Sequence, residues 1–189
     1  PGLQVRTIGI QDKAEVLLSA GMTSAAIDLL EEALTNFITL RLPRMRAECE
    51  VMLGRALLWQ DPARSRTLAR AAARRLRRHG NDSWALRAAT LELIAESASG
   101  RKNPKWLDTA EELSGQLRSN LLTHEAQLLD LTAARVAIAV DDLTGAGELL
   151  ARGRTEATDS LTERLLELRA KADLALARGL AAARGGEHG

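Results

Sequence analysis

The sequence is poor in aromatic residues, proline and cysteine. Aromatic side chains make up 2% of its 189 residues, tyrosine is absent, and there are 4 prolines. The single cysteine excludes a disulfide bond within the chain and is typical of a reducing compartment, so we expect a cytoplasmic location. No apolar run is long enough to cross a bilayer and no signal peptide is apparent, so we expect no membrane partner.

The residues that are abundant indicate a helical protein with a core. Hydrophobic residues make up 46% and charged residues 27% of a chain rich in Ala, Leu, Glu and Arg, a composition typical of all-α domains. The net charge of +1 gives no argument for nucleic-acid binding. Because the chain begins with Pro-Gly and ends with "RGGEHG", we expect it to be a piece of a longer protein.

Small apolar residues recur at a period of about forty. The stretch "AGMTSAAIDLLEEAL" contains a small residue whose position recurs at steps of 39, 41 and 40 residues, as Ala26, Ser65, Trp106 and Ala146. Four residues further on stand Leu30, Ala69, Ala110 and Leu150, and three after those stand Ala33, Ala72, Leu113 and Gly153. Positions i, i+4 and i+7 share one helix face, so each repeat is predicted to bury this face against a closely packed partner helix.

Turn and capping residues divide the chain into helices. Asp61-Pro62 and Asn103-Pro104 each place a capping side chain before a proline at the first helical position, and Ser160 with Glu163 forms a capping box. Gly80 and Gly179 are expected to end helices. The predicted helices lie near 8–20, 23–41, 44–59, 62–79, 83–98, 104–119, 122–140, 143–157 and 160–178.

The series Gly21, Ala26, Leu30 and Ala33 resembles the second half of a tetratricopeptide (TPR) repeat. The resemblance implies an all-α fold, a right-handed superhelix of tandem helical hairpins, here with a period of about 40 residues instead of about 34. HEAT-like stacking is the structural alternative. We expect residues 1–7 to be an N-terminal extension, 8–179 to be the repeat domain of four hairpins and a final helix, and 180–189 to be a flexible tail or linker.

In the TPR family the first helix of each pair lines a concave groove. Carrying that register over gives the expected partner-binding positions. At one level they are Gln11, Glu50, Leu91, Leu131 and Arg169, and one turn deeper they are Glu15, Gly54, Ala95, Arg135 and Asp173. The resemblance implies that this groove binds a protein or peptide segment. The alternative, which the sequence leaves open, is that some of these residues pack against neighbouring helices.

No catalytic, metal or cofactor motif emerges, so we expect no enzyme activity. Cys49 could pair with one of the three histidines as a nucleophile, but its place in the first helix of a repeat favours a buried, structural cysteine. His79 is expected at a helix C-terminus, where a cationic side chain is favourable.

A run of arginines, "RSRTLARAAARRLRRHG", is the strongest charge feature. Arg64 to Arg78 contains seven arginines and no acid. Its outward positions, Arg66, Arg70, Arg74 and Arg77, are interpreted as a solvated helix face. The alternative is a surface that binds nucleic acid, but the run lacks the interleaved aromatics that stack on bases, so a nucleic-acid partner is not expected.

Longer segments, among them "LLSAGMTSAAIDLLEEAL", "RRLRRHGNDSWALRAA", "DDLTGAGELLARGR" and "LRAKADLALARG", resemble the TPR-like region that precedes the caspase-like CHAT domain in large bacterial proteins. The resemblance implies a scaffold that recruits a partner or regulates a downstream domain. An alternative is the helical sensor region of a LuxR-type transcriptional regulator. A third is a nucleic-acid-binding superhelix that uses the Arg64–Arg78 helix.

Overall fold

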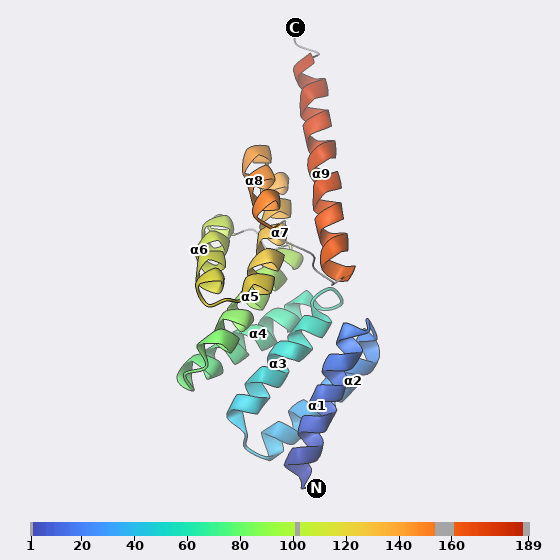
Figure 1. Ribbon diagram of the computed structural model, residues 1–189, viewed down its shortest axis with the longest axis vertical. Coiled ribbons are helices and arrows are strands. Elements are labelled where there is room, and N and C mark those ends of the chain that lie inside the picture. The colour runs from blue at the N-terminus through green and yellow to red at the C-terminus, as the bar shows by residue number, and fades with distance from the viewer. Residues whose placement is uncertain (1, 101–102, 154–160, 187–189) are drawn as a thin grey trace. The chain divides into compact units, whose positions relative to one another are not determined.

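The computed structural model describes residues 2–100, 103–153 and 161–186, and these residues form helices and turns without a strand. The helices in this part of the chain are α1 (Leu3–Ser19), α2 (Thr23–Thr39), α3 (Pro43–Leu57), α4 (Pro62–Arg78), α5 (Asp82–Ala98), α6 (Trp106–Ser119), α7 (Thr123–Ala139), α8 (Leu143–Gly153) and α9 (Leu161–Gly186) (Figure 1). The all-α prediction is confirmed.

The helices belong to two compact units, Pro1–Lys102 and Asn103–Gly189. In the first unit each helix from α1 to α5 packs against the next one along the chain, and α3 also contacts α1 and α5. In the second unit α6 packs on α7, α7 on α8, and α9 on both α7 and α8. Contacts between neighbours and between next-but-one helices are those of a helical repeat array. The helices expected as the third hairpin, α5 and α6, fall in different units.

The predicted small-residue position is buried in every repeat. Ala26 and Ala146 have no exposed surface, Ser65 has none, and Trp106 is 3% exposed. The position four residues further on is also buried each time, in Leu30, Ala69, Ala110 and Leu150. The forty-residue register is therefore confirmed as a register of core positions.

Helices α3 and α4 approach each other closely at Gly54 and Ser65. The Ser65 hydroxyl donates a hydrogen bond of 2.8 Å to the carbonyl oxygen of Gly54. A Cβ at Gly54 would lie 2.8 Å from Cδ2 of Leu91 and 3.4 Å from the carbonyl oxygen of Ser65. Gly54 thus lies close against α4 and α5, and a larger residue would have to displace the end of the Leu91 side chain.

The helix ends repeat one backbone motif. The second residue after the end of α1, α2, α4, α6 and α7 has a positive φ: Gly21, Arg41, Gly80, Leu121 and Asp141. At each of these turns the next residue donates its N–H to a carbonyl five residues back, as in Met22 to Leu17 and Leu42 to Phe37. This pattern is the Schellman motif, which satisfies the last carbonyls of a helix. It confirms Gly80 as a helix-ending residue.

Several helix boundaries differ from the predicted ones. The first helix starts at Leu3 and includes most of the expected extension, and α9 continues through Gly179 to Gly186, so the prediction that Gly179 ends a helix was wrong. The α6 helix starts at Trp106 instead of Pro104 because the Asn103 side chain accepts the Lys105 N–H at 3.0 Å in a local turn. The capping box of Ser160 lies outside the described residues.

The predicted cap of α4 is confirmed. Asp61 accepts a hydrogen bond of 2.9 Å from the backbone N–H of Arg64, and Pro62 occupies the first helical position. Among the described helices, none combines the length and apolar content that crossing a membrane requires.

Candidate functional site

The expected groove positions of the first unit differ widely in exposure. Glu15 on α1 is exposed, whereas Gln11, one turn earlier, is half-buried and donates from Nε2 to the sulfur of Met52 at 3.3 Å. Leu91 on α5 is 4% exposed and lies against Gly54. Of these three positions, Glu15 alone presents a charged group to solvent.

Glu50 is the largest departure from the expected groove. Its side chain is 3% exposed and bridges two arginines. Arg46 Nε lies 3.0 Å from Oε1, and Arg75 Nη1 pairs with Oε2. Because Arg75 belongs to α4, this carboxylate ties α3 to α4. Both carboxylate oxygens are bound inside the protein, which favours the alternative that Glu50 packs against neighbouring helices, and its contact with a partner stays a prediction.

The positions of the second unit are also partly internal. Leu131 has no exposed surface and belongs to a core cluster with residues of α8 and α9. Arg135 and Asp173 are brought together across α7 and α9, with 3.7 Å between Nε and Oδ2. Arg169 is exposed. Partner binding by the accessible positions, Glu15 and Arg169 foremost, stays a prediction.

The arginine helix α4 is more than a solvated face. Arg66 and Arg70 pair with Glu96 and Glu92 of α5 at 3.6 and 2.6 Å. Arg64 pairs with Glu31 of α2 at 2.7 Å. The interpretation of Arg66 as solvated was wrong, because its side chain is 17% exposed. The sequence held the signal: arginines four apart on α4 face acids four apart on an antiparallel α5.

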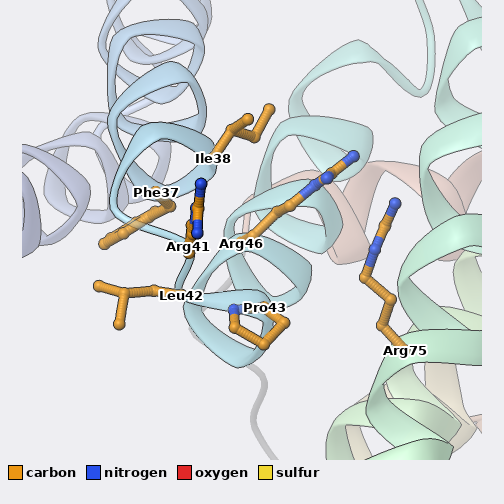
Figure 2. Close-up of a pocket in the computed structure, with 7 residues that line it drawn as sticks. All are labelled: Phe37, Ile38, Arg41, Leu42, Pro43, Arg46 and Arg75. Carbon is orange, nitrogen blue, oxygen red and sulfur yellow. The ribbon is translucent and has the colours of Figure 1, made fainter.

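A pocket of about 340 Å³ opens where α2 turns into α3. Figure 2 shows its lining, with Arg41 on the turn and the guanidinium groups of Arg46 from α3 and Arg75 from α4 near one another. The apolar part of the lining consists of Phe37, Ile38, Leu42 and Pro43. Sequence reasoning missed this pocket, because only the fold brings the turn beside the last turn of α4, which carries Arg75.

A second hollow of about 210 Å³ lies along α4. Its lining is Ala71, Arg74, Arg75 and Arg78, so the two hollows share Arg75. We call the two together the arginine pocket. Five guanidinium groups line it. Two of them pair with Glu50, and no other carboxylate of the described residues pairs with any of the five.

The arginine pocket belongs to a basic part of the chain. Residues 1–102 carry 16 arginines and lysines against 11 acids, whereas residues 103–189 carry 10 against 14. The near-neutral total therefore conceals a first unit with a net charge of +5 and a second with −4. Such a field favours the approach of acidic partners to the first unit.

Cys49 is buried in the core, as predicted. It has no exposed surface, and its sulfur lies 3.4 Å from the carbonyl oxygen of Leu30. Burial, together with the nearby Glu50 charge, raises the pKa of the Cys49 thiol to about 12. The thiol therefore keeps its proton at neutral pH, whereas a nucleophile needs the thiolate.

No cluster of three or more potential metal ligands occurs among the described residues. Comparisons with known proteins found no matching family model, no similar curated protein and no similar solved structure.

Proposed function

We propose that this chain is a non-catalytic scaffold whose helical hairpins bind a protein or peptide segment. The observation that carries the proposal is the arginine pocket, a hollow with both apolar and cationic lining on an exposed edge of the first unit. Protein segments commonly offer apolar and charged groups side by side, and such pockets anchor them.

The packing of the first unit supports this function. The helices around the pocket are held together by buried small residues and by the Glu50 bridge, so the arginine side chains are presented by a fixed frame. A binding surface that is ordered before the partner arrives loses less entropy on association.

The proposed context is a TPR-like region of a larger protein. The buried small-residue register and the repeated hairpin turns support a TPR-like repeat of lengthened period. In that context the scaffold recruits a partner or regulates a downstream domain, which on sequence resemblance is of the CHAT type. The sequence that follows these residues in the full-length protein tests this part directly, because a CHAT domain carries a His/Cys pair.

Protein partners fit α4 better than nucleic acid does. Arg64, Arg66, Arg70 and Arg75 are paired with carboxylates of α2, α3 and α5, which lowers the positive charge that α4 offers to phosphates.

Cross-linking and affinity capture from the native host test the function. The folded chain is immobilised, bound proteins are cross-linked, and the linked peptides are mapped by mass spectrometry. We expect a protein segment linked to the helices of the first unit. Retention of the same proteins by an unrelated helical protein of equal charge would contradict the proposal.

A further inference from the structure

We propose that the arginine pocket binds an acidic peptide segment that inserts one apolar side chain between its carboxylates. This inference rests on the proposed function and specifies its partner chemistry. The expected peptide carries acidic residues on both sides of a large apolar residue. It binds at the edge formed by the α2–α3 turn and α4.

The charge of the pocket calls for carboxylates. Arg41, Arg74 and Arg78 form no ion pair within the described part of the chain. Arg41 and Arg78 are both exposed, so their donors are open to a ligand. A guanidinium group presents paired N–H donors that match the two oxygens of a carboxylate.

The other two arginines of the pocket, Arg46 and Arg75, are held in place by Glu50. Arg46 uses Nε and Arg75 uses Nη1 to hold the buried carboxylate. Each guanidinium group has five N–H donors, so further donors remain on both. Their side chains are 33% and 27% exposed, and they are therefore fixed in place yet still reachable by a partner.

The apolar lining calls for a hydrophobic anchor. Ile38 is 47% exposed, although it is a large apolar side chain on an otherwise amphipathic helix. Leu42, Pro43 and the fully buried Phe37 contribute to the same lining. The volume of about 340 Å³ is at the small end of ligand pockets and suits an anchoring side chain with its backbone.

The same features argue against a nucleic acid as the occupant. Single strands bind through aromatic side chains that stack on bases, and Phe37, the aromatic residue of the lining, is buried. Phosphates would satisfy the arginines but would leave the exposed Ile38 surface uncovered. An acidic peptide with an apolar centre pairs with the arginines and also covers the Ile38 side chain.

Fluorescence anisotropy with the whole chain tests the inference. The probe is a fluorescein-labelled peptide with a central Phe-Leu pair and three acidic residues on either side. One matched peptide replaces the Phe-Leu pair with Ser-Ser, and another replaces the acids with Asn and Gln. The protein variants are Arg41→Gln/Arg78→Gln and Ile38→Asn. Their matched controls are Arg6→Gln/Arg55→Gln and Val16→Asn, exposed positions of the same unit outside the pocket lining.

We expect the acidic Phe-Leu peptide to bind about tenfold or more tightly than either matched peptide, because each lacks one of the two required features. The double arginine variant and Ile38→Asn should each weaken binding about tenfold, while both controls bind as the wild type does. Circular dichroism confirms that every variant is folded.

Any of four results would overturn the inference. The first is equal binding by the pocket variants and their controls, and the second is equal affinity for the Ser-Ser peptide. The third is displacement of the peptide by a lower concentration of a single-stranded oligonucleotide of the same charge. If the peptide fails to bind while affinity capture still retains a partner, the inference falls and the scaffold function stands.

Discussion

Replacing Glu50 with Gln perturbs the group that ties α3 to α4. The carboxylate is 3% exposed and both of its oxygens are held by arginines, one from each helix. Glutamine keeps the size of the side chain and removes the charge. Arg46 and Arg75 then lose their counter-charge, and one amide oxygen has to serve where two carboxylate oxygens did.

The expected loss follows from the burial of the three groups. Removing one partner of a fully buried ion pair costs about 3–5 kcal/mol. Here the two arginines keep 33% and 27% of their side-chain surface, so water compensates part of the loss. We therefore expect Glu50→Gln to lower the free energy of unfolding by about 1–3 kcal/mol.

Urea denaturation followed by circular dichroism measures this loss. Glu15→Gln is the matched control, because Glu15 is an exposed acid of the same unit, and its expected change is below about 0.5 kcal/mol. A double-mutant cycle with Arg75→Gln isolates the bridge between the helices, and we expect a coupling of about 1 kcal/mol.

Equal stability of Glu50→Gln and the Glu15 control, or strict additivity in the cycle, would refute the reasoning. Either result would mean that the carboxylate does not hold the two helices together. Glu50 would then return to consideration as a residue that meets a partner.

Three further predictions concern the fold. Ala26→Leu and Ala146→Leu should each overpack a helix crossing and cost about 1–3 kcal/mol in urea denaturation, whereas Ala63→Leu on an exposed position should be nearly neutral. Leu121 is 86% exposed and has a φ of 58°, so Leu121→Gly should stabilise the protein by about 0.5–1 kcal/mol; an unchanged melting temperature would contradict the turn assignment. The pKa of Cys49 is raised to about 12 in the folded chain, so the folded chain keeps a proton that the unfolded chain releases at lower pH. This contribution to the free energy of unfolding is fully present below the unfolded pKa and is lost as the pH rises towards 12. The Cys49→Ala variant should lack this pH-dependent loss of stability. A decline in urea midpoint between about pH 8 and about pH 11 that is identical in wild type and variant would contradict the prediction.

The repeat register was predictable because it depends on local periodicity. Small residues recurring on one helix face predicted which positions are buried, and Ala26, Ser65 and Ala146 are fully buried. Turn chemistry was predictable where glycine marks it, as at Gly80. The turns at Arg41 and Leu121 use the same left-handed geometry with residues that carry no such signal.

The candidate site was less predictable, because it depends on contacts between helices. Register placed Glu50 on the expected groove side of its helix, but only the packing of α4 shows that Arg46 and Arg75 enclose it. The arginine pocket likewise joins Arg41 and Arg75, which are far apart in the sequence. The spacing of Arg66 and Arg70 against Glu92 and Glu96 held a signal for the α4–α5 ion pairs, whereas no such spacing marks the partners of Glu50.

Affinity capture from the native host with nuclease treatment tests the central claim most directly. Wild type, Arg41→Gln/Arg78→Gln and the control Arg6→Gln/Arg55→Gln are compared side by side. The account predicts that wild type and control retain the same protein partner after nuclease treatment and that the pocket variant loses it. Retention that depends on nucleic acid, or an identical set of proteins on all three, would contradict the account.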